Sequence, residues 1–385
     1  MSVNVLIVYH AGAAATARPL YPALANAGDL AVTVAVPARL RVDPVYDPRG
    51  WLAVDGEETG SGYRMVPVPL CDPSDYWRGF EAHPLRRVMA ETKPDIIHVL
   101  DEPTSGCVFQ VAWHHLAASR RSRVLFYGFD NLPFRLSRRA TWKWKLTWGR
   151  LAGGAAANSE ALENVKRAGF PPDRPLERIF WGVAADAVAP PDDVSLQPEP
   201  DAGERDTVGF VGRLVPEKGV HVLLAALRQL PATVHGLIVG DGPLRSDLEA
   251  QASRPGLKGR VHFTGVVGPA AITVHMRRMR ALAVPSLTAP HWKEQYGRVI
   301  AEAMWHGVAV IGSDSGAIPE VIGRAGIIVP ENDPRALAEA VRRVLFDDDL
   351  RNGLIRLGRQ RAKDELSMNA MADRLVALYG RILGG

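Results

Sequence analysis

The stretch of sequence that is most informative about fold and function is Glu294-Gln-Tyr-Gly-Arg-Val-Ile-Ala-Glu302, which holds two carboxylates eight residues apart. It closes a loop and opens a helix predicted over residues 297–306. An earlier run, Gly212-Arg-Leu-Val-Pro-Glu-Lys-Gly219, forms a basic loop between glycines directly after an expected strand. Together these runs supply the groups needed to hold a nucleoside diphosphate and the polar sugar attached to it.

Short apolar runs alternate with helical patterns along the whole chain, which is typical of parallel sheets flanked by helices. Strands are expected at residues 3–9, 30–36, 96–100, 124–129 and 154–158 in the first half, and at 208–212, 236–239, 261–263, 281–285, 309–312 and 326–329 in the second. The sequence therefore predicts an α/β fold.

The 385 residues suffice for two domains of ordinary size. Residues 186–206 are rich in proline and acidic residues and lack apolar periodicity, so they are predicted to be a linker. We expect one domain over residues 1–185 and a second over 207–366. A final helix over 367–385 carries apolar residues at helical spacing and is expected to pack back onto the first domain.

Composition narrows the function classes. A net charge of +4 is small for this length, and no recognition motif for nucleic acid is visible. Two distant cysteines, Cys71 and Cys107, argue against a disulfide scaffold or a zinc cluster and fit a reducing cytoplasm. The N-terminus resembles a first buried strand more than a secretion signal. No run of about 18 apolar residues predicts a transmembrane helix.

Ligands of open parallel sheets bind at the carboxyl ends of the strands, so the residues there are the candidates for a site. In the first half these are His10, Gly12, Asp101, Glu102, Asp130 and Asn131. In the second half they are Arg213, Lys218, Asp241, Gly242, Val266, Ser286, Asp314 and Gly316. Both rows are polar and could line opposite sides of one site.

Arg213 and Lys218 leave one expected strand within a single short loop. A guanidinium binds two phosphate oxygens in a fork, whereas an ammonium is a mobile point charge, so the pair suits a diphosphate. Gly212 and Gly219 allow the backbone to approach a ligand closely. The alternative interpretation, two solvated surface charges, is equally compatible with these two residues alone.

Gly297 opens the predicted helix, whose first N–H groups lack internal partners and can bind a phosphate. Glu294 precedes this helix within reach of a sugar hydroxyl, and Glu302 could accept hydrogen bonds from the hydroxyls of a ribose. Arg298 lies four residues before Glu302, which permits a helical salt bridge. Both glutamates could also be ordinary polar helix residues.

These runs, with Gly312-Ser-Asp-Ser-Gly-Ala-Ile-Pro-Glu-Val-Ile-Gly323, strongly resemble family 4 of the nucleotide-sugar-dependent glycosyltransferases over about residues 205–330. The resemblance implies a GT-B fold, two Rossmann-like domains facing across a cleft, and a metal-independent reaction that retains the anomeric configuration. It implies catalytic roles for Arg213 and Lys218 on the diphosphate and for Glu294 on the donor sugar. The donor-binding residues it implies are Gly212, Arg213, Lys218, Val266, Tyr296, Gly297, Arg298 and Glu302.

The first half departs from the commoner pattern of the family. Many members place a histidine near the transferred sugar, whereas this chain has Phe129-Asp130-Asn131 and Asp101-Glu102-Pro103 after two expected strands. Asp101, Glu102, Asp130 and Asn131, with His10 and Gly12 in the first loop, are therefore predicted to line the acceptor site. Each carboxylate could instead be a buried structural group. His98, His114 and His115 are predicted to be core histidines.

Residues 135–150 mix arginines and lysines with Trp142, Trp144 and Trp148. Such a mixture is typical of a membrane-surface helix, which would suit a lipid-linked acceptor at the inner membrane face. The tryptophans could instead face the core.

The sequence as a whole predicts a glycosyltransferase of bacterial polysaccharide, glycolipid or glycoside synthesis. Its partners would be a nucleotide sugar and a small-molecule or lipid-linked acceptor, with no nucleic acid, no cofactor and no metal. Two alternatives stay open: a nucleotide-sugar 2-epimerase on the same fold, and a non-catalytic protein that binds nucleotide sugars.

Overall fold

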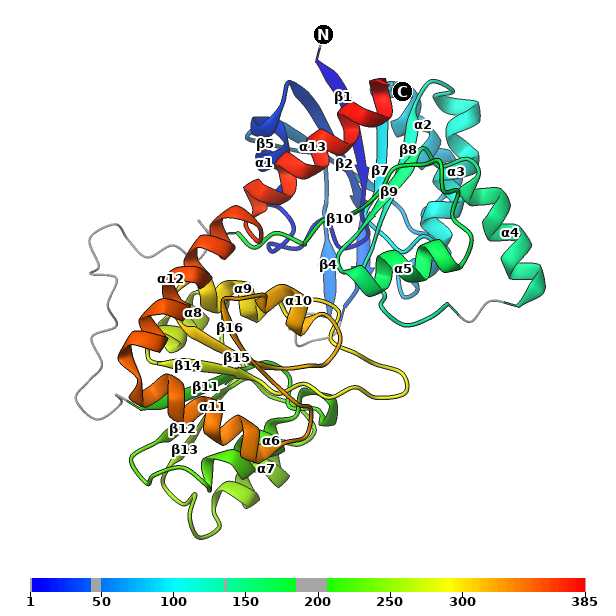
Figure 1. Ribbon diagram of the computed structural model, residues 1–385. Helices are drawn as coiled ribbons and strands as arrows, with labels where there is room; N and C mark the ends of the chain where they lie inside the picture. Colours follow the sequence, from blue (N-terminus) through cyan, green and yellow to red (C-terminus); the bar gives the residue numbers. More distant parts are fainter. Residues whose placement is uncertain (1, 43–49, 135–136, 185–205, 385) are drawn as a thin grey trace. The chain divides into compact units, whose positions relative to one another are not determined.

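The computed structural model describes residues 2–42, 50–134, 137–184 and 206–384. The chain divides into two compact units. Unit 1 comprises Met1–Gly182 together with Met368–Gly385, and unit 2 comprises Val183–Ser367. Each unit is built around one large sheet (Figure 1). The linker expected over residues 186–206 lies outside the described residues except for Asp206.

Unit 1 contains an eight-stranded sheet that is parallel except at one edge, where β5 runs antiparallel to β6. In spatial order its strands are β10 (Leu176–Arg178), β9 (Gly153–Ala156), β8 (Arg123–Gly128), β7 (Ile96–Val99), β1 (Val3–Val8), β2 (Leu30–Pro37), β6 (Tyr63–Val68) and β5 (Glu58–Gly60). The short strands β3 (Arg39–Arg41) and β4 (Trp51–Ala53) form a separate antiparallel pair.

Strand β6 was not expected from the sequence, because Pro67 interrupts its apolar run and proline is depleted in central strands. The structure shows why the proline is tolerated. Strand β5 pairs only with residues 63–65 of β6, so Pro67 lies in the part of the strand beyond β5. At Pro67 the side of β6 that faces β5 is no longer paired with that strand, so the missing N–H of the proline removes no hydrogen bond between these two strands.

Unit 2 contains a six-stranded sheet in which every pair is parallel. In spatial order its strands are β13 (Val261–Gly265), β12 (His235–Val239), β11 (Thr207–Val211), β14 (Ala281–Val284), β15 (Ala309–Ser313) and β16 (Gly326–Val329). Counted along the chain, this is the order 3-2-1-4-5-6 of a doubly wound Rossmann sheet. All six strands lie where the apolar runs predicted them.

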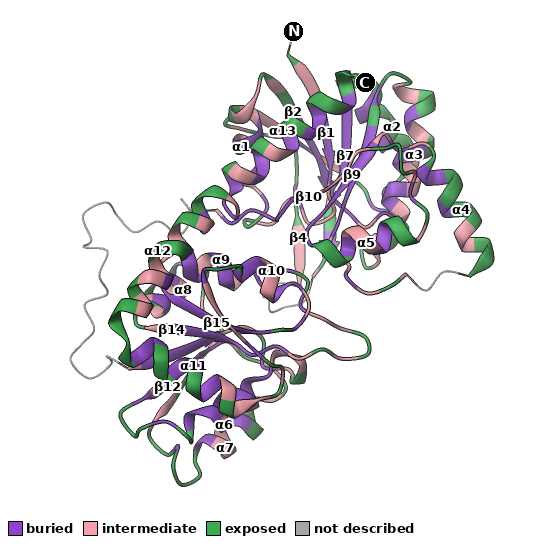
Figure 2. Ribbon diagram, in the orientation of Figure 1, coloured by how far each residue is buried: buried purple, intermediate pink, exposed green. Residues whose placement is uncertain are grey.

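Helices connect the strands of both sheets. Unit 1 holds α1 (Leu20–Ala27), η1 (Tyr76–Arg78), α2 (Ala82–Thr92), α3 (Gly106–Ala118), α4 (Arg138–Trp148), α5 (Ser159–Arg167) and α13 (Met368–Gly384). Unit 2 holds η2 (Pro216–Lys218), α6 (Val220–Leu227), α7 (Arg245–Ala252), α8 (Pro269–Arg277), α9 (Arg298–Trp305), α10 (Ile318–Ile322), α11 (Pro334–Phe346) and α12 (Asp348–Asp364). The central strands are buried, as parallel strands covered on both faces must be (Figure 2).

The last helix, α13, belongs to unit 1 although 185 residues of unit 2 precede it. It packs along α1 and buries Leu375, Leu378 and Tyr379 (Figure 1). The Tyr379 hydroxyl lies 2.7 Å from Nδ1 of His98, which is fully buried in β7. This confirms both the returning helix and the core role of His98. Within the described residues, no helix combines the length and the apolarity needed to cross a bilayer.

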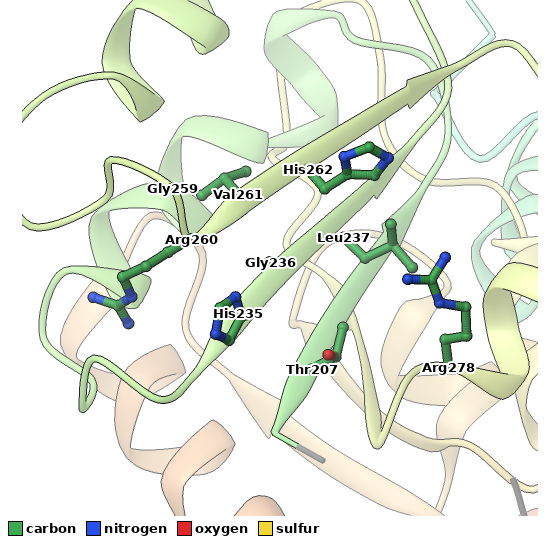
Figure 3. Close-up of a pocket in the computed structure, with 9 residues that line it drawn as sticks. All are labelled: Thr207, His235, Gly236, Leu237, Gly259, Arg260, Val261, His262 and Arg278. Carbon is green, nitrogen blue, oxygen red and sulfur yellow. The ribbon is translucent and has the colours of Figure 1, made fainter. Parts of the chain in front are cut away.

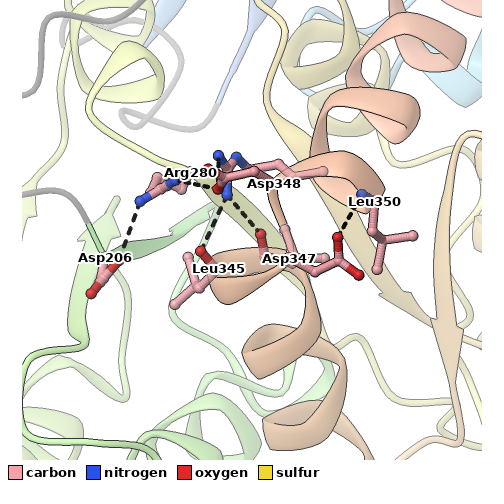
Figure 4. A network of polar contacts seen from close by, with 8 residues as sticks. Asp206, Arg280, Leu345, Asp347, Asp348 and Leu350 are labelled. Carbon is pink, nitrogen blue, oxygen red and sulfur yellow. Dashed lines mark hydrogen bonds and ion pairs between the residues drawn. The ribbon is translucent and has the colours of Figure 1, made fainter.

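Arg280 directly precedes β14 and therefore lies at the amino ends of the strands of the unit 2 sheet. Its guanidinium lies 3.4 Å from Asp206, which precedes β11, and 3.3 Å from Asp348 at the start of α12 (Figure 4). Arg351 contacts the same Asp348 and donates to the carbonyl oxygens of Val344 and Leu345. This network ties two strands to the turn between α11 and α12.

Candidate active site

Each sheet has a topological switch point, where the chain reverses its direction of strand addition and ligands of this fold bind. In unit 2 the point lies between β11 and β14, and in unit 1 between β1 and β7. The loops that leave these strands are residues 212–219 and 285–297 in unit 2, and the loops after Val8 and Val99 in unit 1. Ten of the fifteen predicted site residues lie on these loops, whereas Arg298 and Glu302 lie on α9, Val266 follows β13, and Asp130 and Asn131 follow β8.

The two unit 2 loops are held in backbone contact. Leu287 donates its N–H to the carbonyl oxygen of Glu217 at 2.7 Å. Gly219 has a φ of 68°, and a Cβ added there would lie 1.9 Å from the carbonyl oxygen of Pro285. Only glycine fits this position, because both the backbone conformation and the available space exclude a side chain. The glycine therefore sets the distance between the two loops.

Lys218 and Glu294, predicted separately as site residues, form an ion pair. Their Nζ and Oε2 atoms lie 2.6 Å apart, and the two side chains are only 21% and 9% exposed. The hydroxyl of the fully buried Ser286 donates to the same carboxylate oxygen at 3.1 Å, and the Lys218 ammonium lies 4.9 Å from the centre of the Trp292 ring. The lysine is thus positioned by a carboxylate, a contact that sequence spacing could not predict.

Helix α9 begins at Arg298, and Gly297 precedes it in the left-handed conformation with a φ of 71°. No side chain of the described residues caps this helix start. On α9, Nε of Arg298 lies 2.8 Å from Oε1 of Glu302, which is the helical salt bridge that their spacing predicted. The arginine side chain is half exposed, and the glutamate side chain is 16% exposed. The helix start thus offers backbone N–H groups and a carboxylate on the same element.

The remaining predicted donor residues differ in accessibility. Arg213 is exposed at the end of β11, and Val266, after β13, is 59% exposed. Tyr296 is instead buried, and burial, with a smaller contribution from the Glu302 carboxylate, raises the pKa of its hydroxyl. Its ring therefore has a packing role in this structure, although its backbone remains part of the loop before α9.

The sequence analysis missed Glu331, which organises the adjacent strand ends. Its carboxylate accepts hydrogen bonds from the backbone N–H and the hydroxyl of Thr288, both at 2.5 Å. Its own N–H donates to Asp314 Oδ1 at 2.8 Å, and the Thr288 hydroxyl lies 3.0 Å from that of Ser315. The sequence signal was present, since Glu331 is the first polar residue after the expected strand 326–329, but no candidate residue was predicted after that strand.

In unit 1 the switch point brings His10 and Asp101 together. Nδ1 of His10 lies 3.6 Å from Asp101 Oδ2, and the carboxylate is 5% exposed. The imidazole stacks on the ring of Tyr76, with centroids 4.0 Å apart and an interplanar angle of 15°. Tyr76 was not predicted, because it comes from the short helix η1 and not from a strand end. Burial, with the nearby charges of Asp101, Glu102 and Asp75, raises the pKa of Tyr76 to about 12.

Glu102 holds the neighbouring loop in place. Its Oε1 accepts hydrogen bonds from the backbone N–H groups of Phe129, at 2.6 Å, and Asp130, at 3.0 Å. Burial raises the pKa of its carboxyl to about 8, and the charges of Asp130 and Asp101 act in the same direction. Glu102 is therefore largely protonated at neutral pH, and its structural role is at least as clear as a binding role.

The other predicted acceptor residues lie around this cluster. Asp130 accepts a hydrogen bond from Leu132 N at 3.0 Å, and Asn131 is buried. Gly12 is packed closely, because an added Cβ would lie 2.7 Å from the Tyr21 hydroxyl, which donates to the Gly12 carbonyl oxygen. The loop after β1 is therefore shaped by close packing around Gly12.

A hollow in the described part of unit 2 lies at the opposite, amino ends of the strands. It has a volume of about 300 Å³ and is lined by Thr207, His235, Gly236, Leu237, Gly259, Arg260, Val261, His262 and Arg278 (Figure 3). The Arg260 guanidinium donates hydrogen bonds to backbone carbonyl oxygens, among them those of Val234 and Pro231. Since sheets of this type bind ligands at the other end, this hollow is not the candidate site.

Comparison with known proteins agrees with the geometry. A family model described as "Glycosyl transferases group 1" matches residues 205–347, which is most of unit 2. A 2-deoxystreptamine glucosyltransferase from Streptomyces kanamyceticus is 32% identical over 182 residues, covering 46% of each chain. A phosphatidyl-myo-inositol mannosyltransferase from Mycolicibacterium smegmatis is 34% identical over 215 residues, covering 52% of this chain and 54% of the relative. The chain spans about half the length of the curated relatives it matches.

A solved structure extends the likeness to the whole chain. The Anabaena protein Alr3699/HepE in complex with UDP superimposes with a TM-score of 0.73 at 19% identity, covering 98% of this chain and 100% of that one. At this identity the likeness concerns the fold. Taken with the two large sheets, it shows that this chain has the GT-B fold. The similarity to the group 1 glycosyl transferases covers residues 205–347, the segment that holds the glycine-bounded basic loop.

Proposed function

We propose that this protein transfers a sugar from a nucleoside diphosphate sugar to an acceptor hydroxyl. The observation that carries the proposal is the Lys218–Glu294 pair at the switch point of the unit 2 sheet, 2.6 Å apart and largely shielded from solvent. An ammonium held there next to the start of α9 is suited to a group that gains negative charge as it leaves. The UDP in the Anabaena structure supports a nucleotide as the ligand of this fold.

In the proposed mechanism the bond between the anomeric carbon and the diphosphate oxygen stretches, and positive charge develops on the sugar ring. Lys218, Arg213 and the N–H groups at the start of α9 stabilise the departing diphosphate, and such stabilisation is usually the largest catalytic contribution. The acceptor hydroxyl attacks from the face that the leaving group vacates and passes its proton to a diphosphate oxygen. The anomeric configuration is thereby retained, and no metal ion is required.

Glu294 has two roles in this proposal. It positions the Lys218 ammonium in the resting enzyme, and it accepts a hydrogen bond from a hydroxyl of the donor sugar. Glu302 accepts hydrogen bonds from the ribose, while the backbone near Val266 contacts the base. The Arg298–Glu302 pair holds the Glu302 carboxylate in place while leaving its second oxygen to the ligand.

We propose that the acceptor binds at the carboxyl ends of β1, β7 and β8, beside His10, Asp101 and Asp130. Asp101 is nine-tenths buried, and its Oδ2 has no hydrogen-bond partner among the described residues, so a hydroxyl of the acceptor would satisfy it. The two relatives act, by their names, on 2-deoxystreptamine and phosphatidyl-myo-inositol, both of which carry a hydroxylated six-membered ring. An acceptor of that kind, reached from the cytoplasm, fits the site.

The decisive test is a panel of nucleotide sugars screened for protection against thermal unfolding, because a ligand that binds only the folded state raises the melting temperature. Donors that protect are then incubated with a panel of ring-polyol acceptors in the presence of a chelator, and the products are identified by mass spectrometry. The configuration of the new linkage is determined by NMR. Transfer with inversion, or only in the presence of metal, would contradict the mechanism.

Two other outcomes have clear meanings. Conversion of the nucleotide sugar to an isomer without any acceptor would identify an epimerase. Binding without turnover across the whole panel would identify a sensor. Both contradict the transferase proposal, although neither affects the assigned fold.

A further inference from the structure

Positive charge is concentrated in one part of unit 1. Residues 106–150 contain nine lysines and arginines but a single acidic residue, Asp130, which gives this segment a net charge of +8. The whole chain has a net charge of +4, so the remaining 340 residues are net negative. A segment with twice the charge of its protein produces a local electrostatic field that attracts anionic surfaces.

Helix α4, Arg138–Trp148, shows how this charge is presented. Its sequence, RRATWKWKLTW, has four basic residues and no acidic one. Trp144 and Trp148, four residues apart, are buried, and Trp148 Nε1 donates to the Pro103 carbonyl oxygen at 2.9 Å. These two tryptophans face the core, as the alternative interpretation of this segment allowed, whereas Trp142 does not. Arg135 and Leu136, where the predicted helix began, lie outside the described residues.

The opposite face of α4 exposes large apolar side chains to solvent. Trp142 is 72% exposed and Leu146 is 60% exposed, and the two are the most exposed large apolar side chains in the described part of the chain. They lie one helical turn apart, and Arg138 and Lys145 share their face of the helix. Two such groups on one helical face, surrounded by cations, need a partner to be shielded from water.

Helix α3 extends the same surface. Trp113, 37% exposed, places its Nε1 atom 3.5 Å from the hydroxyl of Thr147 on α4, and the Arg150 guanidinium lies 3.8 Å above its ring. Leu116, one turn further along α3, is also 37% exposed. The sequence of α3 contains no acidic residue either. We call the surface formed by Trp113, Leu116, Trp142 and Leu146 with the basic residues of α4 the α3–α4 patch.

The cations of α4 are not neutralised by carboxylates in the part of the chain that the structure describes. Among the described residues, Arg138, Arg139, Lys143 and Lys145 make no ion pair with a carboxylate. Lys143 instead lies over the rings of Phe109 and Trp144, at 4.2 and 4.7 Å. The charges are therefore available to an external anionic surface.

We propose that the α3–α4 patch docks this protein onto an anionic lipid bilayer, with Trp142 and Leu146 inserted between the head groups. Indole rings prefer the interface between water and lipid, and each basic residue near an anionic bilayer adds about 1 kcal/mol of attraction. A second copy of this chain would bring equal positive charges together, which disfavours self-association through the patch. The inference does not depend on the proposed transferase activity, since it concerns only the surface of unit 1.

The test is sedimentation of the full-length protein with vesicles. One set contains phosphatidylcholine alone, and the other an equimolar mixture with phosphatidylglycerol. Binding is measured at an ionic strength of about 0.01 M and of about 1 M, between which the Debye length falls from about 30 to about 3 Å. We expect binding to the mixed vesicles at the lower ionic strength, and at least a tenfold loss both with neutral vesicles and at the higher ionic strength.

Two double variants separate the two contributions. Trp142→Ala with Leu146→Ala should weaken binding about tenfold or more, through loss of insertion. Arg138→Gln with Lys145→Gln should weaken it about 25-fold, at roughly fivefold for each cation. The matched control, Leu357→Ala with Arg356→Gln, changes the same kinds of residue on the exposed face of α12 in unit 2 and should bind like the unchanged protein.

Several results would overturn the proposal. One is absence of the unchanged protein from the pellet with anionic vesicles at low ionic strength. Another is equal binding by the two patch variants and the control. A concentration-dependent dimer that the Trp142→Ala, Leu146→Ala variant abolishes would show that the patch binds protein instead. Sugar transfer to a water-soluble acceptor without vesicles should be the same for all of these proteins, so failure of that assay affects the proposed function alone.

Discussion

Both sheets have a topological switch point, but the side chains at the two points carry opposite charge. In unit 2 the switch point presents cations, Lys218 held by Glu294 and the exposed Arg213, next to the start of a helix. In unit 1 the equivalent point presents Asp101 and Glu102, with His10 stacked on an aromatic ring. The strand order dictates where a ligand binds, whereas the loops decide which charge it meets.

The difference also concerns how the charges are compensated. The Glu294 carboxylate has an ammonium at 2.6 Å and a serine hydroxyl, so its charge is balanced within the protein. Among the described residues, the hydrogen bonds to the Glu102 carboxylate come from backbone N–H groups, and the nearby charges of Asp130 and Asp101 raise its pKa further. At one edge a carboxylate is paired with a cation, whereas at the other the raised pKa of Glu102 favours its neutral form.

The largest expected effect comes from removing the cation of unit 2. Lys218→Ala should reduce kcat about 10³-fold, because a preorganised group that stabilises a leaving charge is typically worth that much. Steady-state kinetics measure the loss, and circular dichroism should show an intact fold. Lys258→Ala, at an exposed lysine of the same unit, is the control and should keep full activity. Normal turnover in Lys218→Ala would end the claim that unit 2 has a cationic leaving-group site.

The next effect tests the contact between the two unit 2 loops. Gly219→Ala should lower the free energy of unfolding by about 2–4 kcal/mol, since the added Cβ meets the Pro285 carbonyl oxygen and φ is 68°. Gly256→Ala is a matched control, because Gly256 also has a positive φ, 87°, but has no atom within 4 Å of the added Cβ. Urea unfolding of both variants separates the clash from the backbone strain. Equal losses would mean that the loops are not in contact.

The proton on Glu102 offers a test of unit 1. Because folding raises its pKa from 4.5 to about 8, the unfolded chain loses this proton at a lower pH than the folded one. The stabilisation that the protonated Glu102 carboxyl gives to the folded state is fully present below pH 4.5 and is lost as pH rises towards 8. The free energy of unfolding therefore falls across this window. Glu102→Gln keeps the acceptor for Phe129 and Asp130 but cannot ionise.

The variant should therefore gain stability relative to the unchanged protein as pH rises, by roughly 1–3 kcal/mol between pH 5 and pH 8.5. Urea unfolding at the two pH values measures this difference. Glu91→Gln, at an exposed glutamate of α2, should show no such trend. A stability difference for Glu102→Gln that does not depend on pH would show that this edge of unit 1 carries no excess of negative charge.

The smallest effect concerns Glu302. Glu302→Gln should raise the KM for the donor about tenfold while leaving kcat nearly unchanged, as expected for a group that binds the ribose equally in ground and transition states. Its partially exposed pair with Arg298 contributes less than about 0.5 kcal/mol to stability. Glu339→Gln, which removes a similar helical pair with Arg342 on α11, is the control and should leave KM unchanged.

The sequence predicted the fold of unit 2 and the location of its candidate site. Short buried strands with glycine-bounded loops give a local pattern, and the strand order then places Arg213, Lys218 and Glu294 at one edge. Unit 1 was harder to predict in detail. Pro67 concealed β6, and Tyr76 reaches the site from η1, a three-residue helix with no periodic signal. Contacts such as Lys218–Glu294, which join residues 76 positions apart, depend on tertiary packing that no local pattern contains.

The return of α13 has a consequence for how the protein is made. The side chains that this helix contributes to unit 1, among them Tyr379 and its hydrogen bond to His98, belong to the last 18 residues of the chain. During translation, the first unit must therefore stay incomplete until the ribosome has synthesised all of the second one. Unit 1 is completed only after α13 has been synthesised, so a nascent chain stalled before α13 would expose the apolar surface that this helix covers.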